Sequence, residues 1–293
     1  MSKFTWSLSL YFLLTFAVSN TSWAQCSLGL SVKPNEDDAQ FYYPIELLEA
    51  TLAITEDVYP ACKVVKHSAL SEKRRVQALI QESEVDIIWL PARTQVSEQI
   101  LPIKKPIRLG LLGWRVLVVN KQNKDDINLA TSISELNRYR AGFGKHWSDL
   151  PVMLKNFDNV IVHTNLDALY YMLEYQRFDF FSRAIFEVKN EMSALDPSLI
   201  NLSDADQLLL HYPNYSYFFV KANNPALAER IEMGLARLNK NGEWRRLFAR
   251  YYAPVLKQMG FNKRRLIELS APEPQKRHPE YEASYQELMA MAK

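Results

Sequence analysis

The sequence predicts an α/β protein with largely parallel strands, and three observations support this fold class. Short runs rich in β-branched and aromatic residues alternate with stretches of helical periodicity along most of the 293 residues. One run, residues 85–90 (VDIIWL), is apolar almost throughout, which is typical of a strand covered on both faces. The composition, 48% hydrophobic and 23% charged with only 8 glycines, is that of a globular chain and not of a disordered or fibrous one.

The first part of the chain is predicted to alternate strictly between strand and helix. The order strand, helix, strand, helix, strand falls on residues 27–32, 44–55, 63–67, 71–80 and 85–90. In the first of these helices, Pro44 would occupy the first turn, where a missing N–H costs nothing. Ser71 is a candidate N-cap for the second helix. Pro91 ends the third strand.

A second alternating set follows a long extended stretch over residues 107–120. We expect helices at 132–138, 148–155, 167–175, 225–240 and 243–251, and strands at 140–143, 160–163, 178–182 and 215–221. The helix at 225–240 is preceded by Asn223-Asn224 and followed by Asn241-Gly242, which are start and stop signals. Residues 271–293 are rich in proline and polar side chains, so we expect them to wrap the surface or to be loose.

The N-terminus is typical of an export signal that covers residues 1–24. Lys3 supplies a positive charge before an apolar run (LSLYFLLTFAV) that is shorter than the roughly 20 residues a membrane span needs. Ser22 and Ala24 are the small residues expected before a cleavage site, which we place between Ala24 and Gln25. An uncleaved anchor is the alternative. The prediction is export, to the periplasm in a Gram-negative source.

The two cysteines fit such an oxidising compartment. Cys26 immediately precedes the predicted strand 27–32, and Cys62 immediately precedes the predicted strand 63–67. If these are neighbouring parallel strands, both thiols lie at the same end of the sheet and are close enough to bridge. Closing that loop would stabilise the protein by roughly 3–4 kcal/mol. Two free buried thiols are the alternative to this predicted disulfide.

Several large functional classes lack support in the sequence. The formal net charge is only +2, so there is no basic excess of the kind that nucleic-acid binding requires. No phosphate loop, GxGxxG fingerprint, HExxH or GxSxG motif occurs, and 2 cysteines with 5 scattered histidines cannot build a four-thiolate zinc site. Glu174 and Asp179 straddle a helix end, and His163 has no identifiable nucleophile beside it. We therefore expect no enzyme activity, no cofactor and no metal.

Several segments, in chain order, resemble the family 3 extracellular solute-binding proteins, the periplasmic receptors best known for polar amino acids. Residues 218–228 (FFVKANNPALA) look like the family's strand, Asn-Pro turn and helix start, and residues 241–248 (NGEWRRLF) resemble its closing motif. Residues 85–88 (VDII) and 176–181 (QRFDFF) resemble one strand in each of its two lobes. Together these segments span most of residues 26–255.

The resemblance implies a two-lobed periplasmic binding protein of type II, in which two α/β lobes joined by two crossing strands close on a solute. The implied crossings are residues 113–119 and 215–220. The implied first lobe is discontinuous, and the division of the chain is 26–113 plus 218–270 for the first lobe, 116–214 for the second lobe and 271–293 for a C-terminal tail.

The resemblance also places the solute between the lobes, where strand ends meet helix starts. The residues implied to bind it are Tyr42, Tyr43, Arg93, Thr94, Arg115, Lys145, Trp147, Ser148 and Arg183. Arg93 suits a carboxylate, because a planar guanidinium binds one in a bidentate way. Ser148 follows a glycine-containing loop at a helix start, an arrangement that accepts anions. Some of these residues have a structural alternative: one tyrosine in the core, Arg93 on the surface, Trp147 in ordinary packing and Arg115 in a hinge ion pair.

Arg183 marks a departure from the family pattern. An aspartate about here usually grips the ammonium group of the solute, and a cation in its place would repel such a group. We therefore expect a solute with a second anionic group, or a polar neutral solute, and not a standard amino acid.

The function that the sequence favours is that of an exported, monomeric solute-binding protein that closes around a small polar or anionic solute. Its expected partner is an inner-membrane ABC permease. The alternative is a periplasmic sensor that binds a solute and docks on a membrane signalling receptor. A dehydratase of cyclic acids on the same fold is the least favoured hypothesis.

Overall fold

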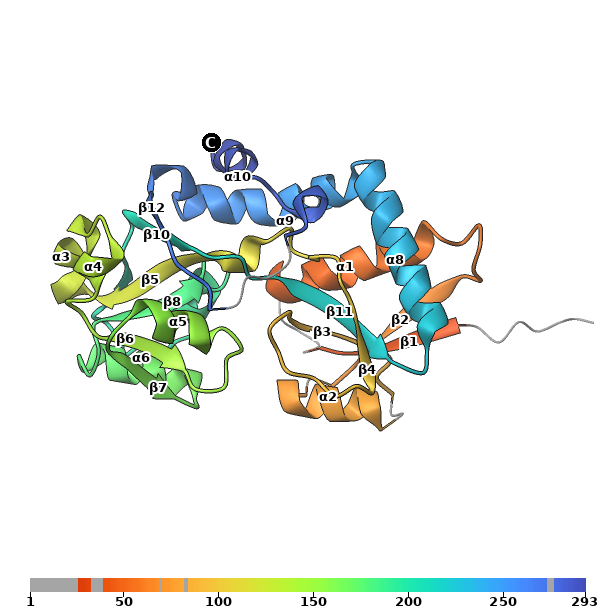
Figure 1. Cartoon of the computed structure of the whole chain (residues 1–293), viewed down its shortest axis with the longest axis horizontal. Coiled ribbons are helices and arrows are strands. Elements are labelled where there is room, and N and C mark those ends of the chain that lie inside the picture. Colours follow the sequence, from red (N-terminus) through yellow and green to blue (C-terminus); the bar gives the residue numbers. More distant parts are fainter. Residues whose placement is uncertain (1–25, 33–38, 69, 82–83, 273–276) are drawn as a thin grey trace, which may run out of the picture.

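The computed structural model describes residues 26–32, 39–68, 70–81, 84–272 and 277–293. The predicted export signal lies outside the described residues. No helix among the residues described is long and apolar enough to cross a membrane. The described chain forms two α/β lobes side by side, with one long helix lying across both (Figure 1).

The first lobe contains a two-stranded sheet and a three-stranded sheet. In the first sheet β1 (Cys26–Ser31) and β2 (Cys62–His67) are parallel. In the second, β11 (Ser216–Lys221) runs antiparallel between β3 (Ile87–Pro91) and β4 (Ile100–Ile103). The helices of this lobe are α1 (Ala39–Ala53), α2 (Glu72–Ile80) and α8 (Pro225–Lys240). Gly29 N–H donates to Asp86 Oδ2 at 2.8 Å, which ties β1 to the start of β3.

The second lobe is built on a mixed seven-stranded sheet with the order β12-β10-β5-β8-β6-β7, in which β9 also pairs with β5. Its strands are β5 (Trp114–Asn120), β6 (Ala141–Gly144), β7 (Val160–His163), β8 (Phe180–Ala184), β9 (Leu202–Asp204), β10 (Leu208–His211) and β12 (Arg265–Glu268). Its helices are α3 (Lys124–Leu129), α4 (Ile133–Leu136), α5 (Leu150–Asn156), α6 (Leu166–Glu174) and α7 (Val188–Ser193). Apolar side chains fill both faces of β5, which is buried along its whole length.

The predicted disulfide is confirmed. Cys26 and Cys62 lie directly opposite each other in the parallel pair of β1 and β2, with their Cα atoms 4.5 Å apart, and a disulfide joins them. β2 is otherwise the more exposed strand of the pair. The covalent bond therefore fixes the register of the pair at the end where neither strand is buried.

Two connections lie side by side where the chain passes between the lobes. Residues 104–113 lead from β4 to β5, and residues 212–215 lead from β10 to β11. Tyr212 N–H donates to the carbonyl of Gly113 at 3.3 Å, and a Cβ on Gly113 would lie 2.0 Å from the carbonyl oxygen of Tyr212. Only glycine permits this close approach of two backbones. We call residues 104–113 and 212–215 the crossing segments.

The expected crossings at 113–119 and 215–220 are therefore displaced, because those residues form β5 and β11 within the two sheets. The expected extended stretch at 107–120 is also interrupted before β5. Leu109 and Gly110 have φ angles of 46° and 82°, so the chain turns there and then forms a short 3-10 helix, Leu111–Gly113. Periodicity could not reveal this turn, because its residues are apolar and buried.

A third connection returns the chain to the second lobe. Helix α9 (Glu243–Gln258) lies across both lobes and is seven residues longer than the predicted 243–251, with Pro254 inside it (Figure 1). β12 then pairs parallel with β10. Residues 265–268 thus extend the sheet of the second lobe, although the family pattern assigned 218–270 to the first.

The first helix also differs from expectation. α1 begins at Ala39 and not at Pro44, so Pro44 lies inside the helix and removes one backbone hydrogen bond.

Of the two expectations for the tail, packing on the surface holds for its described residues 277–292. They pack on the crossing segments and include α10 (Tyr285–Met291), in which Leu288 is fully buried. A capping box at Ser284 and Glu287 starts this helix.

We predict that removing the disulfide with the double variant Cys26→Ser/Cys62→Ser lowers the free energy of unfolding by about 3–4 kcal/mol, because the unfolded chain regains the entropy of a 36-residue loop. Urea unfolding of oxidised wild-type and variant protein measures the difference. The sequence separation alone sets the expected loss of about 3–4 kcal/mol. A loss below about 1 kcal/mol would therefore mean that the disulfide restricts the unfolded chain little.

Candidate functional site

A cleft of about 240 Å³ lies between the lobes, beside the crossing segments. Both lobes contribute to its walls. The lining residues are Glu72, Pro91 and Leu112 from the first lobe and its connection, Asn214 from the second crossing segment, and Arg115, His146, Trp147, Ser148, Asp149, Leu166, Arg183 and Glu187 from the second lobe. A space of this size accommodates a small solute and excludes a polymer.

Alternation along the extended chain directs neighbouring side chains to opposite sides of the crossing segments. Arg115 and Asn214 face the cleft, whereas Trp114 and Pro213, each one residue earlier, line a separate cavity of about 400 Å³ at the rear. The crossing region therefore has a front face, toward the cleft, and a rear face.

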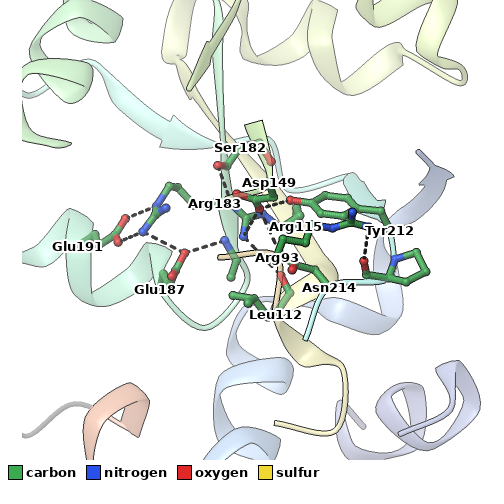
Figure 2. A network of polar contacts seen from close by, with 12 residues as sticks. Arg93, Leu112, Arg115, Asp149, Ser182, Arg183, Glu187, Glu191, Tyr212 and Asn214 are labelled. Atoms are coloured by element: carbon green, nitrogen blue, oxygen red, sulfur yellow. Dashed lines mark hydrogen bonds and ion pairs between the residues drawn. The ribbon is translucent and has the colours of Figure 1, made fainter. Parts of the chain in front are cut away.

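Asp149 is the buried carboxylate that connects the second crossing segment to the second lobe. Its Oδ2 accepts hydrogen bonds from Tyr212 OH at 2.5 Å and from Asn214 Nδ2 at 3.1 Å, and it lies 3.8 Å from Arg115 Nη1 (Figure 2). Arg115 also donates to the carbonyl oxygen of Ser182 at 3.2 Å. All these side chains are buried, so the charge of Arg115 is compensated by Asp149 at the floor of the cleft.

Arg183 is held by two carboxylates. Its guanidinium forms a two-pronged ion pair with Glu191, with Nε 2.7 Å from Oε2, and its Nη2 lies 3.0 Å from Glu187 Oε2 (Figure 2). The guanidinium also lies 4.4 Å from the centre of the Trp147 ring. Tyr170 OH donates to Glu191 Oε2 at 2.7 Å. The positive charge of Arg183, which the sequence analysis expected to attract an anion, is therefore paired within the second lobe. Two carboxylates, Glu187 and Glu191, face this one cation.

The two carboxylates of this cluster have opposite pKa shifts. Burial raises the pKa of Glu187 above its usual range, which Arg183 opposes and Glu191 reinforces. Burial would also raise the pKa of Glu191, but attraction to Arg183 and hydrogen bonds from Arg183 and Tyr170 hold that pKa below its usual range. Glu187, which lines the cleft, is therefore the group of this cluster that protonates first.

Several buried polar atoms around the cleft have no hydrogen-bond partner among the described residues. They are Thr94 Oγ1, Arg115 Nε, Ser148 Oγ, Ser182 Oγ and Asn214 Oδ1. Thr94 belongs to the turn that follows β3 in the first lobe, where its N–H donates to the carbonyl of Pro91 at 3.0 Å. Unpaired buried polar atoms are uncommon in native proteins and are costly. Three of them, on Arg115, Ser148 and Asn214, belong to residues that line the cleft, which is the arrangement expected where a polar solute supplies the missing partners.

The structure brings four of the nine predicted binding residues together on the wall of the cleft: Arg115, Trp147, Ser148 and Arg183. Arg93 and Thr94 lie at the edge of the same region. Arg93 Nη2 donates to the carbonyl oxygen of Pro213 at 3.5 Å, so this side chain bridges from the first lobe to the second crossing segment (Figure 2). Whether any of these residues binds a solute stays a prediction.

The remaining three predicted residues do not reach the cleft. Tyr43 is fully buried in the core of the first lobe, where its hydroxyl donates to the carbonyl of Ile107 at 2.7 Å and accepts from Trp244. The earlier start of α1 explains this placement, because it turns the expected loop residues Tyr42 and Tyr43 into helix residues. Tyr42 lies beside Lys66 of β2, and Lys145 is exposed to solvent.

Sequence reasoning missed Glu72, Asp149, Glu187, Glu191 and Asn214. Asp149 directly follows Ser148, a predicted binding residue, so the sequence could have indicated that Asp149 lies near the cleft. Its hydrogen bond with Tyr212 is a long-range contact that sequence periodicity does not encode. Glu187 and Glu191 are spaced four residues apart, which places both on one face of the segment that contains α7. No group of three or more His, Cys, Asp or Glu side chains suited to a metal ion occurs among the residues that the structure describes.

Comparison with solved structures shows which fold this is. The chain is similar to a histidine kinase sensor domain with similarity to periplasmic binding proteins, at 13% identity and a TM-score of 0.53, over 78% of this chain and 96% of that one. It is also similar to an ancestral arginine-binding protein bound to arginine, at 16% identity and a TM-score of 0.52, over 78% and 99% of the two chains. The substrate binding protein of an amino acid ABC transporter matches at 12% identity and a TM-score of 0.50, over 77% and 99%.

These likenesses confirm the two-lobed periplasmic binding protein fold that the sequence motifs indicated. At such low identity they show the fold alone. No protein-family model and no curated protein sequence matches this chain. The chain is accordingly a divergent example of this architecture.

We predict that Asp149→Ala destabilises the protein by about 3 kcal/mol, because it leaves Arg115 as a buried charge without its carboxylate. Urea unfolding measures the change, and Asp158→Ala, at an exposed position of the same lobe, is the matched control. Equal stability of the two variants would show that Asp149 does not hold the second crossing segment.

The pH dependence of Glu187→Gln tests the Arg183 cluster. Because burial raises the folded-state pKa of Glu187, this group contributes stability that is complete below its usual value of 4.5 and is lost as the pH rises through the folded-state pKa. Wild-type protein should therefore gain stability relative to Glu187→Gln as the pH falls from about 7 to about 4.5. Urea unfolding across this range measures the difference, and a difference that does not change with pH would contradict the assignment.

Proposed function

We propose that this protein is an exported solute-binding protein that closes its two lobes around one small polar solute and performs no covalent chemistry. The observation that carries the proposal is the set of unpaired polar atoms on residues that line the cleft, Arg115 Nε, Ser148 Oγ and Asn214 Oδ1. Thr94 Oγ1, also unpaired, follows Pro91, the first-lobe residue of the wall, by three positions. These atoms form an incomplete hydrogen-bonding shell, mainly on the second lobe, and Glu72 and Pro91 of the first lobe face it across the cleft. A solute that satisfies the shell and contacts both lobes stabilises the closed arrangement by its differential affinity for it.

The charges on the cleft wall refine the class of solute. Its charged residues are two arginines, Arg115 and Arg183, and three carboxylates, Glu72, Asp149 and Glu187, and Glu191 lies behind Arg183. The sequence suggested that Arg183 would repel an ammonium group and favour an anion. Because two carboxylates already face Arg183, that objection no longer applies. We therefore propose a polar solute without net negative charge, and amino-acid-like zwitterions are included in this class.

Two biological settings remain for such a receptor. Structural neighbours include the substrate binding protein of an amino acid ABC transporter, which supports delivery of the solute to an inner-membrane ABC permease. A histidine kinase sensor domain is also a neighbour and supports the alternative, in which the closed protein signals to a membrane receptor. We favour uptake by an ABC transporter, with the protein acting as a periplasmic monomer after cleavage of residues 1–24.

An enzymatic function has less support. The structural neighbours named above are binding proteins or a sensor domain. Glu187, on the cleft wall, and Glu191, behind it, both pair with Arg183 and are not placed on opposite sides of an open space, as an acid and base acting on a substrate would be. A dehydratase on this fold is therefore the least favoured alternative.

Thermal unfolding of purified residues 25–293 with a library of solutes tests the proposal. A true ligand at about 100 times its dissociation constant should stabilise the protein by about 2.7 kcal/mol and raise the midpoint by several degrees. The library contains amino acids, polyols and amides, with dicarboxylates and keto acids as the anionic set. Hits among zwitterions or neutral solutes would support the proposal, and hits confined to the anionic set would contradict the charge argument.

Ser148→Ala and Thr94→Val test the two lobes separately. Since neither hydroxyl has a partner within the described chain, each variant should leave the stability of the free protein unchanged. Each should weaken a ligand found in the screen by about fivefold, the value of one lost hydrogen bond. Ser134→Ala, at an exposed position in α4, is the control. Unchanged affinity in both cleft variants would place the ligand elsewhere.

A further inference from the structure

The C-terminal segment, residues 277–292, lies on the rear face of the crossing segments, opposite the cleft. Figure 1 shows α10 on the same side of the molecule as α9, above the region where the two lobes meet. Three parts of this segment make three different kinds of contact: with the first lobe, with the turn in the first crossing segment and with the second lobe.

The first contacts are with the first lobe, the first crossing segment and α9. Asn239 of α8, in the first lobe, donates from Nδ2 to the carbonyl oxygen of Glu280 at 3.0 Å. Tyr281 OH accepts from Lys105 Nζ at 3.0 Å, and the Tyr281 ring lies 5.6 Å from that of Trp244 in α9. Glu287 forms an ion pair with Arg245, also in α9, at 2.7 Å. These contacts anchor the segment to the helix that lies across both lobes.

The second contacts are with the turn at Leu109. Ala283 N–H donates to the carbonyl oxygen of Leu109 at 2.9 Å. Leu109 has a φ of 46°, a left-handed conformation that a leucine adopts only at a cost, and surrounding contacts must hold it there. Glu282 Oε1 accepts from Tyr215 OH at 2.7 Å, so the same two residues of the tail bind both crossing segments.

The third contacts are with the second lobe. Tyr285 stacks on Trp114, the first residue of β5, with ring centres 5.3 Å apart and an angle of 11° between the planes. It also contacts Phe261, which precedes β12. Trp114 is also stacked against His211, with ring centres 4.0 Å apart. The tail therefore presses on the residue next to Arg115, whose side chain points into the cleft.

We propose that residues 277–292 act as a brace that fixes the angle between the lobes, so that the cleft opens wider only when Tyr285 and Glu282 leave Trp114 and Tyr215. The brace contacts both lobes and both crossing segments on the side opposite the cleft. Any rotation of the lobes changes the distances between these contact points, because the rear of a hinge moves in the opposite sense to its front. The contacts thus stabilise the observed angle over others.

This brace regulates the cleft of the proposed function, but its test measures the geometry of the lobes and not binding. If the distance measurement contradicts the brace, the solute-binding proposal still stands. If the solute screen finds no ligand, the brace proposal still stands.

The experiment measures the distance between spin labels on cysteines introduced at Lys73 in α2 and Leu154 in α5, one exposed position in each lobe. The native cysteines are joined in the disulfide and do not react with the label. The full chain should give a single narrow distance distribution. The variant Glu282→Ala/Tyr285→Ala should give a broader distribution that shifts toward longer distances.

Gln286→Ala, at an exposed position of α10, is the matched control and should reproduce the wild-type distribution. If the double variant does not fold, Tyr285→Ala alone supplies the test, since it leaves the capping box of α10 in place. A folded variant whose distance distribution is the same as that of the wild-type chain would overturn the brace.

Discussion

The close antiparallel approach of the two crossing segments is the constraint on which the rest of the structure depends. Gly113 and Tyr212 bring their backbones together where only a glycine fits, and Asp149 fastens the second segment to the second lobe through Tyr212 and Asn214. Directly beside this contact, Arg115 and Asn214 reach one face, and their chain neighbours Trp114 and Pro213 reach the other. One short region therefore supplies the floor of the cleft on its front and the contact surface of the C-terminal tail on its rear.

The cleft combines satisfied charges with unsatisfied neutral polar atoms. Its arginines are paired with carboxylates inside the second lobe, so their desolvation is largely compensated before any solute arrives. The hydroxyls of Thr94 and Ser148 have no such partners among the described residues. Hydrogen bonding to these atoms, more than charge attraction, would then discriminate between solutes, because leaving a buried polar atom unpaired is the larger penalty.

The sequence was sufficient for the fold class, for most strands and helices, for the disulfide and, through its motifs, for the two-lobed architecture. It was sufficient where a pattern is local, as in α8, whose bounds match the prediction at both ends. It failed where contacts between elements determine the position of a segment or the partners of a side chain. β12 joins the second lobe by pairing with β10, and Glu187 and Glu191 pair with Arg183. Tyr43 was misplaced because α1 starts five residues earlier than its proline suggested.

Hydrogen–deuterium exchange of the full chain, with and without a pool of small polar solutes, tests the central claim most directly. If the cleft binds a solute by closing both lobes on it, the amides of residues 90–94 and of residues 144–149 should become protected together, one segment from each lobe. Protection of only one segment, or protection confined to regions away from the cleft, would contradict the account.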